Sequence, residues 1–374
     1  MSVTVLKNAN VLLPDLTFCA TDVVLEGGRI ASIGHTDLPG RDLSGKYLIP
    51  GLVDIHTHGC NGGDHLDGTE EATAAILRRM AQVGTTTVLS TIMTQSRENM
   101  VKAAENTRIC AAKDLGARIR GIYLEGPFFS EQYKGAQHPM YLCDPDHSLI
   151  DRLQAASGGM VKILSLAPEK PGALEFIQNR TDVRIFAGHT ASDYDTARAA
   201  FEAGVCGLTH SFNGMTPLHH RKPGVLAAAM ERNHVFCECI CDGFHDHPAM
   251  VAMLYRQVGE ERFCVISDSL RPAGLPDGDY TSGGQPITVR NGKALLTDGT
   301  IAGSTAYLLE EVRNLVAWGV CSLEKAVYAA SAVPAKAAGI YDEVGSIEEG
   351  KAADLLILND DLSLDAVIIS GKTI

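Results

Sequence analysis

The sequence predicts an α/β protein in which a (β/α)8 TIM-like barrel carries a small β-sandwich domain built from both chain ends. Two observations lead to this fold class. The middle of the 374-residue chain alternates apolar, strand-like runs with segments of helical periodicity, and the two ends share a different, β-rich character. Eight successive β-then-α units are typical of a barrel whose functional side chains lie at the carboxyl ends of its strands.

The barrel strands are predicted from eight short apolar runs. They lie in residues 52–58, 85–91, 120–126, 161–168, 183–190, 206–212, 235–243 and 263–269. Most of the gaps between them hold an amphipathic helical candidate. The clearest helices are predicted over 70–84, 193–204, 247–259, 304–319 and 322–339.

The two chain ends are predicted to pair into one small β domain. Short β-rich runs with glycine turns fill residues 1–50, and residues 341–374 have the same character. Neither end is long enough to be stable as a sheet of its own. We therefore expect residues 1–50 and 341–374 to form one domain and residues 51–340 to form the barrel.

Composition and charge argue against several classes of protein. The chain has 45% hydrophobic and 21% charged residues, which suits a globular core rather than disorder. A formal charge of -13 argues against nucleic acid or an anionic membrane surface as partner. The N-terminus, interrupted by Lys7 and Pro14, resembles neither a secretory signal nor a membrane span. Ten cysteines without small-domain spacing suit a reducing, cytoplasmic location.

Three of the cysteines alternate within the predicted strand 235–243. Cys237, Cys239 and Cys241 would share one face of that strand. They could form a metal cluster or serve as small core residues. Because free cysteine behaves as a small buried hydrophobe, we expect core residues.

Polar residues of metal-ligand type end several of the predicted strands. His56 and His58 are two positions apart, so their side chains project to the same side of the first strand. Each of these residues alone could be an ordinary loop or capping residue, but together they would face one cavity of a barrel. The full set is His56, His58, Glu125, His189, His210 and Asp268.

Four histidines and a glutamate exceed the four-ligand shell of a structural zinc site. We therefore expect one divalent metal with an open position, or two metals sharing the carboxylate; Zn, Fe, Co and Mn all suit these ligands. Such a metal would supply hydroxide from bound water, and Asp268 is suited to move the proton. Neither a G-x-S-x-G elbow nor a P-loop occurs in the sequence, so metal-assisted hydrolysis is the predicted chemistry.

Six motifs carry a more specific resemblance. In chain order they are PGLVDIHTHG, YLEGPFFSEQYKGAQHP, FAGHTAS, THSFNGMTPLHHRKPG, CDGFHDH and ISDSLRPAGLPDG. Together they resemble the amidohydrolase superfamily, and more narrowly its N-acetylglucosamine-6-phosphate deacetylase family, over nearly the whole chain. The resemblance implies hydrolysis of N-acetyl-D-glucosamine 6-phosphate to D-glucosamine 6-phosphate and acetate, in amino-sugar catabolism.

The resemblance also implies roles for single residues. Glu125, His189 and His210 match metal ligands, and Asp268 matches the catalytic acid/base. His56 and His58 match positions that hold a second metal in some members of the family, so one or two metals are expected. The substrate-binding positions are Asn213, the backbone at Gly214, His245, and Arg221, which matches an arginine reaching the phosphate in a neighbouring subunit and so implies a homodimer.

The chain departs from the family at two places. Gly214 stands where an alanine is common, which should change little if only the backbone amide is used. Gln137 stands where some members have a histidine that polarises the substrate carbonyl, and His138 follows it. Either residue could make that contact.

Two other kinds of function stay open at this point. One is a different amidohydrolase: a deaminase, a cyclic-amide hydrolase, or the deacetylase of the galactosamine epimer. Many cyclic-amide hydrolases bridge their metals with a modified lysine, a role that would fall to Glu125 here. The other is a non-catalytic barrel kept for binding; such proteins usually lose ligands or the strand-eight acid, and this chain retains them.

Overall fold

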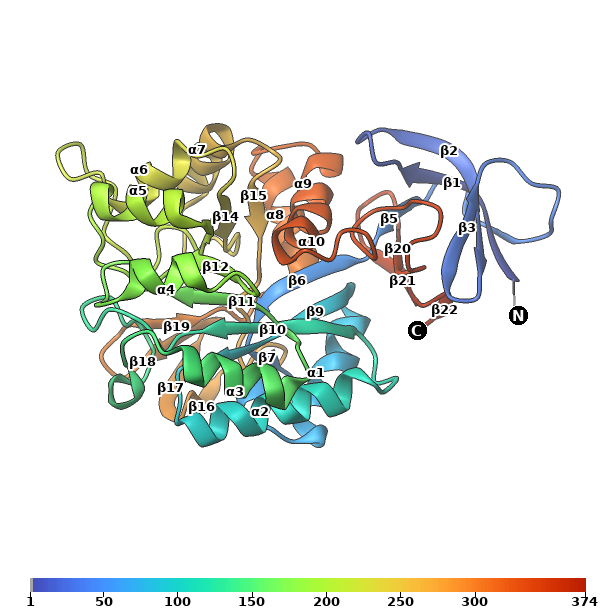
Figure 1. Cartoon of the computed structure of the whole chain (residues 1–374). Helices are drawn as coiled ribbons and strands as arrows, with labels where there is room; N and C mark the ends of the chain where they lie inside the picture. Colours follow the sequence, from blue (N-terminus) through green and yellow to red (C-terminus); the bar gives the residue numbers. More distant parts are fainter. Residues whose placement is uncertain (1–2) are drawn as a thin grey trace.

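The middle of the chain forms a barrel of parallel strands. The computed structural model describes residues 3–374, and within them eight strands pair in the order β6-β9-β10-β11-β12-β13-β14-β15 (Figure 1). Each strand overlaps the apolar run predicted for it, which confirms the barrel. The strands are β6 (Leu52–Thr57), β9 (Thr85–Met93), β10 (Arg118–Glu125), β11 (Val161–Leu166), β12 (Arg184–Ala187), β13 (Val205–Leu208), β14 (Phe236–Cys239) and β15 (Phe263–Val265).

Loop backbone joins the first barrel strand to the last one. The N–H of Asp268 donates to the carbonyl of His56 at 2.9 Å, and the N–H of His58 donates to the carbonyl of Ser269 at 2.9 Å. These bonds lie at the carboxyl end of β6 and just beyond that of β15. They bring the acid that follows the eighth strand beside the histidines of the first.

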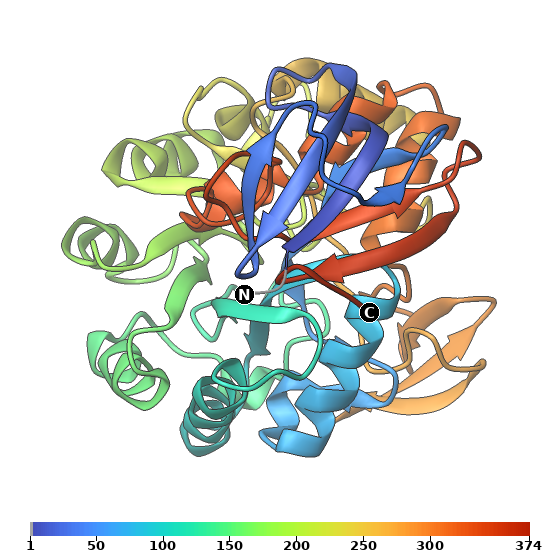
Figure 2. The same cartoon turned by 90° about the vertical axis from the view of Figure 1, so that its right-hand side faces the viewer.

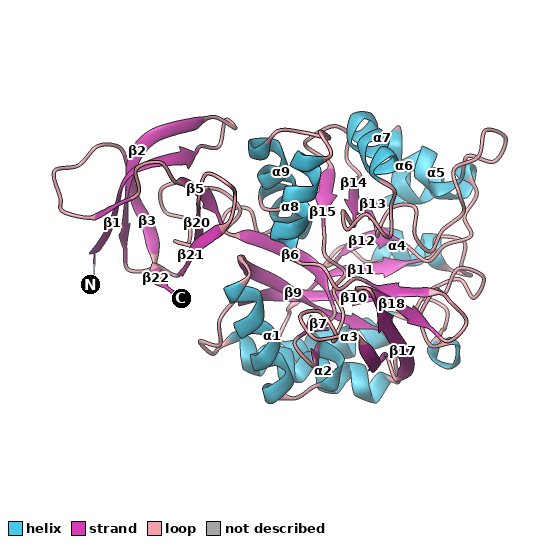
Figure 3. Cartoon of the chain, turned by 180° about the vertical axis from the view of Figure 1, so that it is seen from behind, coloured by secondary structure: helices cyan, strands magenta, loops and turns pink. Residues whose placement is uncertain are grey.

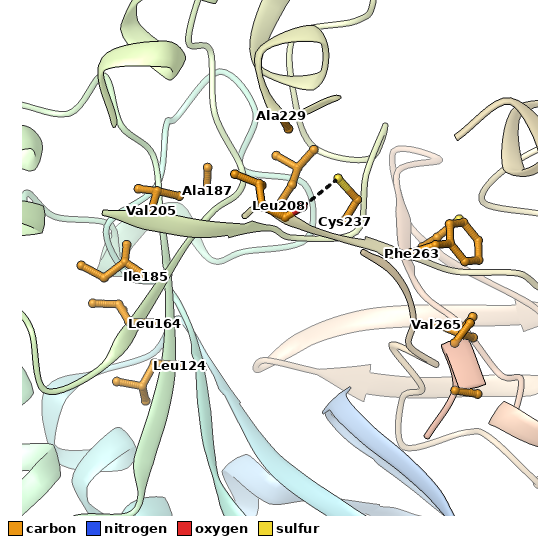
Figure 4. Close-up of a cluster of buried hydrophobic side chains, with 14 of the residues drawn as sticks. Leu124, Leu164, Ile185, Ala187, Val205, Leu208, Ala229, Cys237, Phe263 and Val265 are labelled. Atoms are coloured by element: carbon orange, nitrogen blue, oxygen red, sulfur yellow. Dashed lines mark hydrogen bonds between the residues drawn. The ribbon is translucent and has the colours of Figure 1, made fainter. Parts of the chain in front are cut away.

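The barrel strands separate two layers of buried side chains. Outward residues such as Leu124, Leu164 and Leu208 pack beneath the surrounding helices (Figure 4). Inward residues such as Tyr123 and Phe186 fill the barrel interior. Cys237, Cys239 and Cys241 belong to the outer layer, which confirms them as core residues.

Helices cover the outside of the barrel (Figures 2 and 3). The predicted helices over 70–84, 193–204, 247–259 and 304–319 are confirmed as α1, α5, α7 and α8. The segment 322–339 forms two helices rather than one, because Pro334 has no N–H to continue the hydrogen-bond pattern from Ala330. The helices are α1 (Glu70–Gln82), α2 (Arg97–Ala111), α3 (His147–Ser157), α4 (Ala173–Asn179), α5 (Tyr194–Ala203), α6 (Gly224–Met230), α7 (Pro248–Val258), α8 (Leu308–Ala317), α9 (Leu323–Ala329) and α10 (Ala332–Ala338).

An antiparallel sheet interrupts the last β-then-α unit. Between β15 and α8 the chain forms four strands instead of passing directly to a helix, a feature that the sequence analysis missed. The strands are β16 (Gly278–Ser282), β17 (Gln285–Arg290), β18 (Lys293–Leu296) and β19 (Ile301–Gly303). Shorter elements beside the site are β7 (Gly59–Cys60), β8 (Gly63–Asp64), η1 (His65–Asp67) and η2 (Pro139–Tyr141).

Both chain ends build one mixed sheet of eight strands beside the barrel (Figure 1). The two ends meet where β5 pairs antiparallel with β20, with Leu48 opposite Ile357. This confirms a small β structure made from both ends, while boundaries at residues 50 and 340 stay a proposal. The strands are β1 (Val3–Leu12), β2 (Phe18–Glu26), β3 (Arg29–Ile33), β4 (Arg41–Asp42), β5 (Tyr47–Pro50), β20 (Leu355–Leu358), β21 (Leu364–Ile369) and β22 (Lys372–Thr373).

None of the helices within residues 3–374 is both long enough and apolar enough to cross a membrane.

Candidate metal centre and active site

The barrel brings all six strand-end residues into one buried cluster around Glu125. Glu125 Oε1 lies 3.0 Å from His189 Nε2 and 3.2 Å from His210 Nε2. On the other side, Glu125 Oε2 lies 3.2 Å from His58 Nε2, which is also 3.1 Å from Asp268 Oδ1. Both oxygens of one carboxylate are therefore shared between histidines from different strands.

The backbone is strained where three of these residues leave their strands. His189, His210 and Asp268 have φ angles of 44°, 25° and 46°, in the left-handed region that residues other than glycine seldom adopt. They follow β12, β13 and β15 closely. Such strain at three strand ends of one barrel is typical of a functional site, where surrounding structure holds side chains in place.

The ring of His189 lies between two glycines. A Cβ atom at Gly214 would lie 2.8 Å from His189 Nδ1, and one at Gly135 would lie 3.0 Å from His189 Cε1. Gly214 also has a φ of +58°, so any side chain there is strained. A methyl group at this position would require the ring of His189 or the loop to shift, so glycine is the residue that fits the arrangement in this chain. The expectation that the departure from alanine changes little for the backbone amide stays a prediction.

Two histidines direct lone pairs at the same point. His189 Nδ1 lies 2.8 Å from the carbonyl of Tyr133, and His210 Nδ1 lies 3.1 Å from the carbonyl of Asn213. A carbonyl accepts a proton, so Nδ1 is the donor and Nε2 is the acceptor in each neutral ring. The two Nε2 atoms nevertheless lie 3.1 Å apart and face Glu125 Oε1. One proton can form a hydrogen bond between only two of these three atoms, whereas a divalent metal can bind Nε2 of both histidines and Oε1 of Glu125 at once. This triad therefore fits a metal.

A second group of ligand type shares Glu125. The ligand atoms of His56, His58 and Glu125 lie within 4.8 Å of one another, as do those of Glu125, His189 and His210. His56 Nδ1 lies 3.1 Å from Glu238 Oε2, which leaves Nε2 as the ligand atom. Within residues 3–374, the buried Nε2 of His56 has no hydrogen-bond partner, so its lone pair is available to a metal.

The carboxylates of this cluster stay charged despite their burial. Burial alone would raise the pKa of Asp268, but the imidazoles of His56 and His58 outweigh it and hold that pKa below its usual value. Burial likewise opposes ionisation of Glu125, yet its hydrogen bonds, with His189 foremost, hold the pKa well below its usual range. The site therefore presents two ionised carboxylates, whose charge is balanced by protons on the histidines or by a metal cation that replaces those protons.

All residues of the cluster except His56 line a cavity of about 220 Å³. Among the residues predicted to contact substrate, Gln137, Asn213, Gly214 and His245 line this cavity. Ligand residues and substrate-type residues therefore face the same space. The remaining lining residues are Met93, Gly135, Ala136, Thr300, Ile301, Ala302 and Gly303.

Comparisons with known proteins identify this arrangement. The amidohydrolase family matches residues 47–374. N-acetylglucosamine-6-phosphate deacetylase of Bacillus subtilis is 38% identical, over 97% of this chain and 96% of its own length. The chain belongs to the N-acetylglucosamine-6-phosphate deacetylase family of amidohydrolases. N-acetylgalactosamine-6-phosphate deacetylase of Escherichia coli is 34% identical over 92% of both chains.

Solved structures of this deacetylase family agree with the fold. That of N-acetyl-D-glucosamine-6-phosphate deacetylase from Mycobacterium smegmatis, an aspartate-to-alanine mutant in complex with N-acetyl-D-glucosamine-6-phosphate, has a TM-score of 0.94 at 32% identity. The match covers 100% of this chain and 99% of the other. It therefore includes the barrel, the inserted sheet and the β structure of the chain ends.

Gln137 and His138, the two candidates for contact with the substrate carbonyl, lie in different places. Gln137 is buried, and its Nε2 donates to Glu125 Oε2 at 2.7 Å. His138 is not among the residues lining the cavity in the described part of the chain. Instead its Nδ1 accepts the N–H of Met140 at 3.3 Å, and its ring packs against Tyr141. The geometry therefore places Gln137, and not His138, beside Glu125 in the candidate metal cluster.

Of the residues that the resemblance links to the sugar or its phosphate, some line the cavity and one lies at the surface. His245 lines the cavity and its Nδ1 lies 2.7 Å from Asp242 Oδ2. Asn213 also lines it and its Nδ2 donates to Asp246 Oδ1 at 3.3 Å. Arg221 is exposed on the loop before α6 and is not among the described residues that line the cavity at the ligand cluster. Its Nη1 lies 2.6 Å from His220 Nε2, and its exposure allows a contact outside its own chain.

The structure adds site residues that the sequence analysis missed. Glu238 reaches His56 from inside the barrel, as strand alternation implies once Cys237 and Cys239 face outward. Thr300 and its neighbours reach the cavity from the inserted sheet. The Gly283-Gly284 pair and the Asn291-Gly292 turn are hairpin signals that could have revealed this sheet.

Proposed function

We propose that this protein is a metal-dependent deacetylase that converts N-acetyl-D-glucosamine 6-phosphate to D-glucosamine 6-phosphate and acetate. The observation that carries the proposal is the pair of ligand triads sharing Glu125, with Asp268 beside them in one cavity. Membership of the deacetylase family supports the substrate, since the curated relatives from Bacillus subtilis and Vibrio furnissii carry this activity in their names.

Two groups of side chains that share Glu125 are assigned as metal ligands. Glu125, His189 and His210 would hold one divalent ion, and His56 and His58 together with Glu125 would hold a second. A divalent metal at such a site lowers the pKa of water toward neutrality and polarises the amide carbonyl. Zn, Fe, Co and Mn all suit this mixture of imidazole and carboxylate.

Asp268 would carry the proton through the reaction. Its carboxyl has a lowered pKa, so it is ionised at neutral pH and can accept a proton from the attacking water. The same carboxyl would then donate that proton to the amide nitrogen as the C–N bond breaks. Acetate and a free amine are the balanced products.

The other end of the substrate would be held by residues that suit a phosphate. We assign this role to Asn213, the backbone at Gly214 and His245, which line the cavity, and to Arg221 from a neighbouring subunit. The protein would then be a homodimer. Its cysteines, free throughout residues 3–374, suit the cytoplasm, where amino-sugar catabolism would consume the product.

The test is acetate release from metal-replete protein with N-acetylglucosamine 6-phosphate, unphosphorylated N-acetylglucosamine and N-acetylgalactosamine 6-phosphate. Rapid turnover of the first sugar alone is expected. Faster turnover of the galactosamine epimer would shift the assignment toward the activity in the Escherichia coli relative's name. Turnover of none of the three would overturn the proposal.

A further inference from the structure

A carboxylate behind the ligand cluster carries an inference about how one of the ligand histidines is held in place. Glu238 lies on β14 and is fully buried. We propose that Glu238 is a positioning residue that orients His56 as a ligand of the second metal assigned above to His56, His58 and Glu125. The inference rests on the proposed metal-dependent function and concerns a residue that contacts neither metal nor substrate.

One oxygen of Glu238 serves both halves of the ligand cluster. Glu238 Oε2 lies 3.1 Å from His56 Nδ1 and accepts the backbone N–H of His210 at 3.1 Å. The hydroxyl of Tyr123 lies 3.5 Å from the same oxygen. The backbone carbonyl of Glu238 also accepts the N–H of Ser211 at 2.8 Å. The carboxylate therefore ties a ligand of one triad to the strained strand end that carries a ligand of the other.

This contact determines which nitrogen of His56 faces the cluster. A carboxylate at Nδ1 holds the proton there, so Nε2 carries the lone pair. Nε2 points toward Glu125 Oε1 at 3.7 Å and Asp268 Oδ1 at 3.6 Å. The Tyr123 ring packs against the imidazole with centroids 4.5 Å apart, which opposes rotation of the ring.

The four histidines of the cluster differ in what orients them. Nδ1 of His189 and Nδ1 of His210 each face a neutral backbone carbonyl. Among the described residues, Nδ1 of His58 has no hydrogen-bond partner. Only His56 in this set has a carboxylate behind it, and a carboxylate makes an imidazole a stronger ligand. The second triad should therefore depend on Glu238 far more than the first.

The experiment measures metal binding rather than activity. Apo-protein is titrated with Co²⁺, and absorption spectra, calorimetry and the metal content after gel filtration give the number and affinity of sites. Glu238→Gln keeps an acceptor oxygen but removes the charge. We expect unsubstituted protein to bind two ions, and Glu238→Gln to weaken one site by about 10- to 100-fold while the other changes little.

Glu311→Gln is the matched control. Glu311 is also fully buried, and burial raises the pKa of its carboxyl well above the usual value, so neutralising it changes little. This variant should keep both sites. Two unchanged sites in Glu238→Gln, or equal weakening of both sites, would overturn the proposal, as would a single site in the unsubstituted protein.

A measurement on the unsubstituted chain covers the case in which Glu238→Gln does not fold. Nitrogen-15 NMR of the histidine rings reports which nitrogen carries the proton. We expect a protected Nδ1–H on His56 that persists when the metal is added, with the metal shift confined to Nε2. A proton on Nε2 in the metal-loaded protein, or a metal shift at Nδ1, would overturn the proposal. Failure to release acetate from any sugar phosphate would overturn the proposed function and leave this result unaffected.

Discussion

Gln137 is bound at both ends of its amide. Its Nε2 donates to Glu125 Oε2 at 2.7 Å, and its Oε1 accepts the N–H of Thr94 at 3.0 Å. A side-chain amide has two N–H donors, so one remains for a substrate carbonyl. Gln137, which stands where some family members have a histidine, therefore orients Glu125, the carboxylate assigned to both metals, and also faces the cavity.

Gln137→Ala should weaken metal binding and lower activity together. Loss of the amide frees the carboxylate of Glu125 to rotate, and removal of such outer contacts typically costs about 10- to 100-fold in metal affinity or activity. Metal content at limiting free metal and kcat would be measured. His138→Ala is the control and should change neither, because its ring packs against Tyr141 outside the cavity. The reverse pattern would return the role to His138.

Asp268→Asn should lower kcat by about 10² to 10⁴-fold with little change in KM, because positioned proton transfer contributes a factor of that size. Bound metal should stay the same, since His58 keeps an oxygen neighbour at this position. Steady-state kinetics and metal analysis check both statements. A kcat within tenfold of the unsubstituted protein would show that another group moves the proton.

Gly214→Ala should displace the ring of His189. The added methyl group meets Nδ1 at 2.8 Å, and the positive φ adds about 1 kcal/mol of strain. We expect a lower stability and weaker metal binding, read from denaturant unfolding and Co²⁺ titration. Gly172→Ala is a matched control, since its φ of +75° gives similar strain but no atom lies within 4 Å of the new Cβ in the described structure. It should lose stability and keep its metal affinity.

Metal affinity should rise with pH. Burial alone would lower the pKa of His210, but its bond to Glu125 outweighs this and raises the pKa to about 9. Because its pKa is raised, protonated His210 stabilises the metal-free folded state. This stabilisation is complete at pH values below 6.5, the pKa in the unfolded chain, and it is lost as the pH rises through about 9. A metal must displace this proton, so affinity should increase about tenfold per pH unit from 7 to 9. Chelator competition would measure it, and a flat profile would contradict the assignment of His210 as ligand.

Arg221→Ala and Asp268→Asn should complement each other if Arg221 acts in the neighbouring subunit. Each variant alone should be nearly inactive, whereas mixed dimers contain one site with both residues intact. Activity after subunit exchange would be measured with N-acetylglucosamine 6-phosphate. Lys222→Ala, next along the same exposed loop, should stay active alone. No recovery after verified exchange would remove the shared-site assignment.

The sequence determined the barrel and its polar strand ends because these depend on local pattern. Apolar runs and amphipathic periods specify strands and helices within a few residues, as they did from β6 to β15. The position of a ligand-type residue at a strand end is likewise a local property. Once the strands are parallel, barrel closure forces residues such as Glu125 and His210 onto one rim.

Only the tertiary structure decided which groups touch. Glu238 is 182 residues from His56, and Gln137 turns its amide toward a carboxylate rather than leaving it wholly to the substrate. Neither contact has a local signature, because both depend on barrel closure and on the exact direction of side chains at its rim. The same closure left Arg221 exposed and His138 outside the cavity, although both lie in motifs that the sequence linked to substrate.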